Sequence, residues 1–178
     1  MDNRYVKILA SGSKAPLKAT PGHFATNHSH INYYLDMTTL KTRLSEAQEI
    51  AKHLAERFLF DKVVDTIVCL EGTQVIGAYL AEELTRAGVL STNAHKTIYV
   101  ITPEYNSNSQ MVFRENILPM VRGKNVVILT AVVTTGLSLN KSIEAIQYYG
   151  GKLQSAAAVF STLDELNGCP ITSIYSPA

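Results

Sequence analysis

The segment Thr134–Ser138 has the residue types of an anion-binding turn. It lies between the apolar run Val126–Val133 and a helical pattern that begins near Ser138. Gly136 permits a ligand to approach the backbone closely, and the hydroxyl groups around it supply hydrogen-bond partners. Unpaired N–H groups at the start of the following helix carry about half a positive charge, which favours phosphate. A structural strand-to-helix turn has similar residues, so the turn by itself leaves both interpretations open.

Two other loops follow apolar strands in the same way. Glu71–Thr73 comes after the run Asp65–Leu70, and Thr102–Gln110 comes after the run Lys96–Ile101. In an open α/β sheet, ligands bind beyond the carboxyl ends of the strands, so we expect the three loops to line one site. The commoner nucleotide-binding patterns, G-x-G-x-x-G and G-x-x-x-x-G-K-[ST], do not occur in the sequence.

The spacing of apolar residues predicts the strands and helices that position these loops. Three- and four-residue spacing predicts helices, whereas short apolar runs predict buried strands. The predicted strands are 5–9, 31–37, 65–70, 96–101, 126–133 and 155–161, and the predicted helices are 44–58, 75–84 and 138–149. This alternation predicts an α/β fold with a parallel sheet flanked by helices. Residues 10–30 show no clear period, and Asp164–Glu165 is expected to start a solvated helix.

The composition predicts one globular domain that binds neither nucleic acid nor a membrane. A chain of 178 residues, 46% of them hydrophobic, is sufficient for a single domain with a substantial core. A net charge of +1 gives no overall attraction to nucleic acid or anionic lipid, and no apolar run reaches the ~18 residues of a membrane span. The N-terminus has no apolar signal-peptide core, and the two cysteines form no disulfide or metal-ligand pattern, so a cytoplasmic location is expected.

The strand–VVTTGLS–helix unit resembles the phosphoribosyl-diphosphate loop of type I phosphoribosyltransferases. In that family an apolar strand leads into two acids, two apolar residues and then Thr-Thr/Ala-Gly-x-Ser/Thr. The order of elements is most similar to the orotate phosphoribosyltransferase branch, over roughly Ile31 to Ser161. Within that span, INYYLDM resembles the tyrosine-containing substrate strand, CLEGTQVIGAYLAEEL the diphosphate-binding unit, YVITPE the end of the Arg-Lys-Glu strand, and GGKLQSAAAVFS the strand after the phosphate helix.

The resemblance implies a fold, a ligand and an assembly. The fold would be a type I phosphoribosyltransferase-like domain over 1–178, with a small N-terminal hood at about 1–40 and an α/β core at about 41–165. The ligand would be phosphoribosyl diphosphate or a nucleoside monophosphate, and the reaction would transfer ribose 5-phosphate to a nitrogenous base such as the pyrimidine orotate. Mg²⁺ would be carried by the diphosphate, with no metal held by the protein. The family's sites are commonly completed across a two-fold interface, so a homodimer is implied.

The resemblance also implies binding residues in three groups. The first group would wrap the 5-phosphate, the second would lie against the diphosphate, and the third would approach the base or its lid. The phosphate-binding group is Thr134, Thr135, Gly136, Leu137 and Ser138; the diphosphate loop is Glu71, Gly72, Thr73 and Gln74; the base or lid candidates are Tyr33, Tyr34 and Asp36.

Two departures from the family pattern concern the chemistry of transfer. Thr130 and Ala131 stand where the family has the acidic pair that holds the ribose hydroxyls. Thr102–Glu104 stands where the orotate branch has Arg-Lys-Glu, and the lysine and histidine of the family's mobile loop are absent. The remaining catalytic candidates are Glu104 and Arg114. Because loss of one preorganised electrostatic group typically costs about 10²–10³ in rate, these departures bear directly on activity.

Two functions therefore remain open at the level of the sequence. The first is a phosphoribosyltransferase with altered chemistry or an unfamiliar base. The second is a non-catalytic protein that retains the phosphate loop and senses phosphoribosyl diphosphate or a nucleotide. An unrelated α/β phosphate-binding protein is a third interpretation, since a fold does not fix a function.

Overall fold

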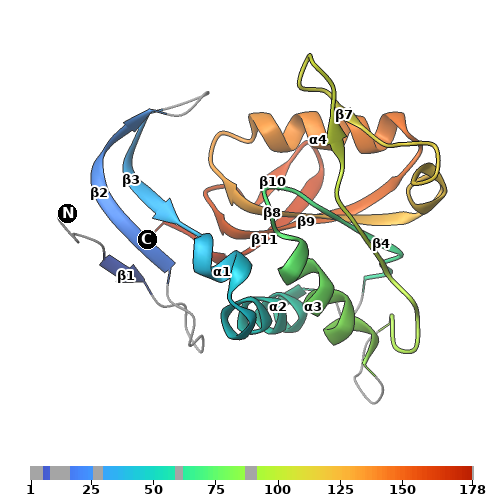
Figure 1. Cartoon of the computed structure of the whole chain (residues 1–178), viewed down its shortest axis with the longest axis horizontal. Helices are drawn as coiled ribbons and strands as arrows, with labels where there is room; N and C mark the ends of the chain where they lie inside the picture. Colours follow the sequence, from blue (N-terminus) through green and yellow to red (C-terminus); the bar gives the residue numbers. More distant parts are fainter. Residues whose placement is uncertain (1–5, 9–16, 26–29, 59–61, 87–91, 178) are drawn as a thin grey trace.

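The computed structural model of the chain describes residues 6–8, 17–25, 30–58, 62–86 and 92–177. These ranges contain a six-stranded sheet with helices on both faces, a small three-stranded sheet and a two-stranded hairpin (Figure 1). The strands of the large sheet are β4 (Thr66–Cys69), β5 (Tyr99–Ile101), β8 (Asn125–Val133), β9 (Lys152–Ser161), β10 (Glu165–Leu166) and β11 (Cys169–Tyr175). The helices are α1 (Thr38–Thr42), α2 (Leu44–Phe58), α3 (Gln74–Thr85), α4 (Leu137–Tyr148) and the 3₁₀ turn η1 (Leu118–Met120).

The large sheet is parallel except at one edge. Its strand order is β10-β11-β9-β8-β4-β5, and among the described strands of this sheet only β10 and β11 pair in the antiparallel sense. β4 is buried throughout and β8 along most of its length, as expected of parallel strands covered on both faces. The predicted α/β class, with a mostly parallel sheet flanked by helices, is confirmed.

β4 and β8 lie on either side of a topological switch point. From β4 the chain passes through α3 to β5 on one side, and it later enters β8 on the other side of β4. Crossovers that run in opposite directions along a sheet cover opposite faces, and α3 and α4 do lie on opposite faces (Figure 1). The turns that leave β4 and β8, 70–73 and 133–138, therefore lie at the position where open α/β sheets bind ligands. We call these two turns the switch-point edge.

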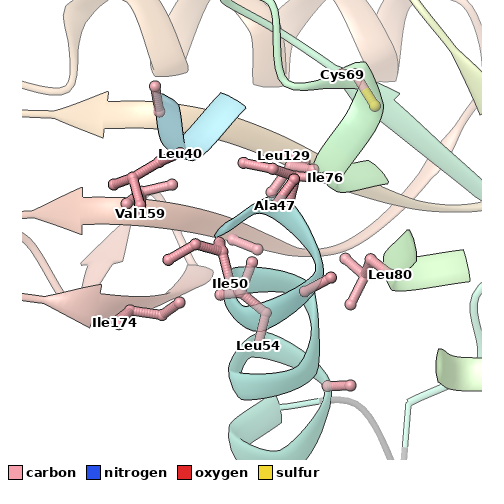
Figure 2. Close-up of a cluster of buried hydrophobic side chains, with 14 of the residues drawn as sticks. Leu40, Ala47, Ile50, Leu54, Cys69, Ile76, Leu80, Leu129, Val159 and Ile174 are labelled. Carbon is pink, nitrogen blue, oxygen red and sulfur yellow. The ribbon is translucent and has the colours of Figure 1, made fainter. Parts of the chain in front are cut away.

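The two faces of the sheet carry separate hydrophobic cores. α2 and α3 cover one face, and α4 covers the other. Full burial of a large aliphatic side chain contributes about 1.5–3 kcal/mol, so these contacts hold the starts of α3 and α4 firmly against the sheet. The core on the α2–α3 face includes Leu40, Ile50, Leu54, Ile76, Leu80 and Leu129 (Figure 2), and the core on the α4 face includes Leu139, Ile143 and Ile146.

The N-terminal sheet consists of three antiparallel strands beside the main domain (Figure 1). β2 (Leu17–Ala25) pairs with both β1 (Val6–Ile8) and β3 (His30–Asp36). β3 leads directly into α1, and the side chains of Leu17 and Leu40 are buried in the same core as α2. This packing joins the small sheet to the main domain. The division into a hood and a core remains a prediction.

Most of the predicted elements are present, with three differences. β2 occupies part of a stretch in which no period was expected, because Pro21 and Gly22 interrupt its apolar alternation. The expected loop Thr102–Gln110 contains a strand, β6 (Glu104–Tyr105), which pairs with β7 (Met111–Val112). The prediction that a helix starts at Asp164–Glu165 was wrong. That segment enters β10, and an Asn-Gly turn with φ of 50° and 79° returns the chain along β11.

Candidate functional site

The turn between β8 and α4 places a left-handed glycine directly before an exposed helix start. Gly136 has a left-handed φ of 83° and precedes the first helical residue. The first helical hydrogen bond runs from the Asn140 N–H to the Gly136 carbonyl at 2.8 Å. The N–H groups of residues 137–139 precede that bond, and such groups have no partner within a helix. The Leu137 N–H has a long contact of 3.4 Å with Thr135 Oγ1. Thr135, Leu137 and Ser138 are exposed.

The glycine of this turn is also required by the packing around it. A Cβ on Gly136 would lie 3.0 Å from Leu166 and 3.1 Å from Leu163, which is tighter than ordinary van der Waals contact. The Thr162 N–H and hydroxyl donate to the carbonyls of Val133 (3.0 Å) and Thr134 (2.6 Å), so the segment after β9 is fastened to the turn. Gly136 thus has a structural reason to be glycine, whether or not the turn binds phosphate.

The turn after β4 is a tight four-residue turn with an uncommon backbone. Glu71 and Gly72 both have positive φ, 55° and 73°, and the Thr73 N–H donates to the Leu70 carbonyl at 3.2 Å. Two consecutive positive φ values are typical of a type I′ turn. The Thr73 hydroxyl donates to the carbonyls of Leu70 (2.7 Å) and Leu129 (3.1 Å), and this fully buried side chain ties the turn to β8. Glu71, Gly72 and the first residue of α3 are exposed.

A lysine that sequence reasoning missed lies over this turn. Lys41 Nζ donates to the Glu71 carbonyl at 2.9 Å, and it lies 3.8 Å from the position of a Cβ on Gly72. The two residues are 30 positions apart in the chain, and Lys41 comes from the five-residue α1, which carries no recognisable pattern in the sequence. Lys41 supplies a cation at the switch-point edge. In the sequence it has no neighbouring motif that could have identified it.

The Glu71 carboxylate extends from its turn toward the end of β8. Its Oε2 lies 3.4 Å from the Val132 nitrogen, one residue beyond Ala131. The phenol of Tyr105, at the end of β6, has its pKa raised by burial and by the charge of Glu71. The side chain of Tyr105 is 56% exposed, so it presents an aromatic face to solvent close to the same carboxylate.

The two positions that correspond to the family's acidic pair are part of the core. Thr130 is 3% and Ala131 is 2% exposed. Ala131 packs in the α2–α3 core, and Thr130 pairs with Ala158 of β9. Neither side chain carries a charge, so β8 itself delivers no carboxylate to the switch-point edge.

The two catalytic candidates from the sequence are paired with each other. Arg114 Nε lies 2.8 Å from Glu104 Oε2, and both side chains are more than half exposed. The pairing of β6 with β7 brings the two residues together. An exposed pair of this kind contributes about 0–1 kcal/mol. Because its charge is paired with that of Glu104, Arg114 is a less suitable cation for a bound anion than Lys41.

The base or lid candidates lie on or next to β3. Tyr33 and Tyr34 are within that strand, opposite Pro21 and Thr20 of β2. Asp36 Oδ1 accepts a hydrogen bond from the N–H of Thr38, the first residue of α1. This backbone hydrogen bond, the Thr38 hydroxyl and nearby lysines lower the pKa of Asp36, although burial opposes them. The carboxylate of Asp36 is therefore occupied by its hydrogen bond to the first N–H of α1.

Two further properties of the described residues bear on what the site can hold. No group of three or more histidine, cysteine, aspartate or glutamate side chains lies together in the described ranges as a metal site would require. Within the same ranges, each helix is either too short or too polar to cross a membrane.

Comparison by sequence matches the chain to no family model and to no curated protein. Comparison by structure finds phosphoribosyltransferases. The orotate phosphoribosyltransferase of Mycobacterium tuberculosis H37Rv, in its complex with 5-phospho-α-D-ribosyl 1-diphosphate, aligns with a TM-score of 0.59, 17% identity and 80% of each chain covered. The orotate phosphoribosyltransferase of Aeropyrum pernix aligns with a TM-score of 0.59 and 18% identity over 89% of this chain and 87% of that one. The adenine phosphoribosyltransferase of Rhodothermus marinus aligns with a TM-score of 0.59 and 15% identity over 90% and 94%.

These likenesses show that the chain has the type I phosphoribosyltransferase fold, and the resemblance inferred from the sequence is confirmed at that level. Because the identities are low, they establish the fold and leave the ligand and the reaction to be argued from this chain's own residues.

Proposed function

We propose that this protein binds a 5-phosphoribosyl ligand, phosphoribosyl diphosphate or a nucleoside monophosphate, at the switch-point edge, and that it acts as a phosphoribosyltransferase on a nitrogenous base. One observation carries the proposal. The turn at Gly136 and the positive-φ turn at Glu71–Gly72 leave neighbouring parallel strands at the switch point. The first turn opens at the start of α4, and Lys41 lies against the second. Both turns offer what phosphate oxygens require.

The proposed roles divide the ligand between the two turns. The 5-phosphate binds at the start of α4, where the hydroxyls of Thr135 and Ser138 and the N–H groups of residues 137–139 donate hydrogen bonds to it. The diphosphate binds against Gly72, with Lys41 as its cation. Tyr105, Tyr33 and Tyr34 are the aromatic candidates for the base. Pyrimidine specificity, with orotate as the first base to test, rests on the resemblance alone.

Mg²⁺ fits this site as an ion that the ligand brings. Mg²⁺ usually keeps several waters and takes substrate phosphates as ligands, so a diphosphate brings the ion to this edge without a metal site in the protein. When bound, the ion would neutralise charge on the diphosphate. The chain's own residues orient the phosphates and hold the sugar.

The second candidate function is a non-catalytic sensor of the same ligands. The burial of uncharged Thr130 and Ala131 at the end of β8 favours it, because nothing on that strand can stabilise a developing sugar cation. A sensor needs affinity and a binding-dependent change in state, whereas a transferase needs preferential stabilisation of the transition state. The two functions therefore predict the same binding but different turnover.

Calorimetry with phosphoribosyl diphosphate, ribose 5-phosphate, nucleoside monophosphates and free bases, with and without Mg²⁺, tests the binding. Diphosphate release in the presence of each base tests the transfer. We expect binding of the phosphorylated ligands and slow, base-dependent diphosphate release. Binding without release for any base would favour the sensor, and no binding of any phosphorylated ligand would refute both functions.

The variant Ser138→Asp tests the location of the site. An acidic residue in the first turn of a helix stabilises the helix, so the fold is expected to persist, while the new charge repels phosphate. Gln147→Glu is the matched control, because it adds the same charge to exposed surface near the other end of α4. We expect Ser138→Asp alone to weaken ribose 5-phosphate binding by about tenfold or more, the loss of one charge-assisted hydrogen bond. Undiminished binding by a folded Ser138→Asp variant would place the site elsewhere.

We also propose a homodimer in the cytoplasm, on the strength of the resemblance. A second copy could supply further cations to the switch-point edge, in addition to Lys41 of the same chain. Sedimentation at micromolar concentration measures the assembly. A monomer under those conditions would refute the dimer and leave the binding proposal intact.

A further inference from the structure

The site lacks an acceptor for the ribose hydroxyls on the strand where the family pattern has one. Thr130 and Ala131 are buried and uncharged. A ligand held at both turns would place its sugar between them, next to the end of β8. Sugar hydroxyls donate hydrogen bonds, and a carboxylate is the strongest acceptor among protein side chains. The question is which described side chain can bring a carboxylate to that position.

Glu71 reaches the end of β8 from the neighbouring strand. The ladder between β4 and β8 pairs Cys69 with Leu129, and the next bond joins the Leu70 N–H to the Leu129 carbonyl at 2.8 Å. Beyond that point the β4 chain turns away, and the Glu71 side chain lies back across β8, with Oε2 3.4 Å from the Val132 nitrogen. Its carboxylate is thus at the backbone position that directly follows Ala131.

The backbone of Glu71 is held in a conformation that glutamate rarely adopts. Its φ of 55° lies in the left-handed region, where glycine and asparagine are the common residues. The Lys41 ammonium donates to the carbonyl of this same residue at 2.9 Å. Strain at a turn of this kind persists only where the surroundings enforce it, and it concentrates at functional positions. A glycine or asparagine at position 71 would form the turn more easily, but it would not carry a carboxylate to β8.

The Glu71 carboxylate is also available to a ligand. In the described ranges it takes part in no salt bridge, and its recorded hydrogen bond, to the Val132 N–H, is long and leaves most of its lone pairs unused. By contrast, Glu104 is paired with Arg114, and Asp36 receives the Thr38 N–H at the start of α1. Glu71 is therefore the carboxylate of these three that is both at the switch-point edge and uncommitted.

We propose that Glu71 accepts the hydrogen bonds of the ribose 2- and 3-hydroxyls and so takes the place of the acidic pair that β8 lacks. The proposal rests on the proposed function, since it names the sugar contact of the same site. It assigns Glu71 a binding role that acts on the sugar and not on the phosphate. Selectivity for ribose over 2-deoxyribose is its direct consequence.

The test compares ribose 5-phosphate, 2-deoxyribose 5-phosphate and inorganic phosphate by calorimetry, in the parent and in Glu71→Gln. Glutamine retains the shape and the turn but loses the charge. We expect the parent to prefer ribose 5-phosphate over its 2-deoxy analogue by about tenfold, the ratio that one charge-assisted hydrogen bond supports. In Glu71→Gln the preference should fall to about threefold or less, while inorganic phosphate binds as tightly as before. Glu82→Gln, an exposed site toward the far end of α3, is the control for the loss of one negative charge and should retain the parent's ratio.

Three results would overturn the proposal. The first is a parent without preference for ribose, and the second is a Glu71→Gln variant that keeps the parent's preference. The third is a Glu71→Gln variant that loses affinity equally for all three ligands, since that would assign Glu71 to the turn alone. These outcomes leave phosphate binding measurable and the proposed function standing. If the parent binds none of the three ligands, the proposed function and this inference fail together.

Glu71→Asp gives an independent measurement if the glutamine variant proves unstable. Aspartate retains the charge and tolerates the left-handed conformation better, but its side chain is one methylene shorter and does not reach β8. We expect Glu71→Asp to lose the ribose preference while its melting temperature equals or exceeds that of the parent. An unchanged preference in this variant would also overturn the proposal.

Discussion

Replacing Lys41 by methionine should weaken binding of the diphosphate group and leave binding of the rest of the ligand unchanged. Methionine retains most of the apolar stem and removes the ammonium group. Lys41 Nζ lies 2.9 Å from the Glu71 carbonyl and 3.8 Å from the Cβ position of Gly72, so a diphosphate bound against that turn would lie next to the ammonium group. Ribose 5-phosphate has no group at this place. We therefore expect Lys41→Met to weaken phosphoribosyl diphosphate and to leave ribose 5-phosphate almost unchanged.

The size of the effect follows from the exposure of the lysine. At 4 Å, two unit charges attract by about 4 kcal/mol when the effective dielectric constant is about 20, which is an upper bound before desolvation. A net hydrogen bond to a charged group contributes about 1.5–3 kcal/mol. Lys41 is only half-buried, so the lower part of that range applies. The expected loss of affinity for phosphoribosyl diphosphate is about 10- to 30-fold, against less than about twofold for ribose 5-phosphate.

Calorimetry at two salt concentrations measures these affinities, and a melting curve reports on the fold. Lys52→Met, on the exposed surface of α2, is the control for the loss of one positive charge. Lys41→Arg should recover most of the affinity, because it restores the charge. Equal weakening of both ligands by Lys41→Met would refute the reasoning, since it would mean that Lys41 acts only by holding the turn at Glu71. An unchanged affinity for phosphoribosyl diphosphate would refute it as well.

Three further predictions concern the scaffold of the site. Gly136→Ala should lower the free energy of unfolding by about 2–4 kcal/mol, because a Cβ is unfavourable at φ 83° and would press on the segment after β9. Chemical denaturation measures this loss, and a loss below about 1 kcal/mol would contradict the packing argument. Gly77→Ala should lower the free energy of unfolding by about 1–2 kcal/mol despite the higher helix propensity of alanine, because the new Cβ would overlap buried Cys69. The loss should be smaller in a Cys69→Ala background, and additive losses would show that the overlap is not the cause. Burial raises the pKa of Asp65, but hydrogen bonds from Lys96 and a backbone N–H outweigh it and hold the pKa below the usual 3.8. The stabilisation by Asp65 is therefore complete above the unfolded-state pKa and is lost as pH falls through the folded-state pKa. Asp65→Asn should be less stable than the parent at pH 7, and the difference in stability should narrow below about pH 4. A difference in stability that is independent of pH would disprove this assignment.

The elements with strong periodicity were predictable from the sequence. The helical spacing between Leu44 and Phe58 corresponds to α2, and the continuous apolar run ending at Val133 corresponds to β8. Local patterns suffice there because the side-chain periods of helix and strand are set by the backbone itself. β2 and β10 could not be predicted, because β2 contains Pro21 and Gly22, and β10 has only two residues. Such strands are stabilised by pairing with partners far along the chain and not by their own pattern.

For the site, the sequence by itself determined the two turns, and the tertiary structure decided which charges lie beside them. Thr134–Ser138 and Glu71–Gln74 were identifiable because glycine, threonine and serine between a strand and a helix have a local conformational meaning. The approach of Lys41 to the Glu71 carbonyl joins residues 30 positions apart, and that of the Glu71 carboxylate to Val132 joins residues 61 apart. Those contacts depend on α1 following β3 and on β4 and β8 being neighbours across a switch point. A charge brought into place by chain crossover leaves no mark in its own sequence neighbourhood, whereas a turn does, because its backbone angles must be satisfied by the residues that form it.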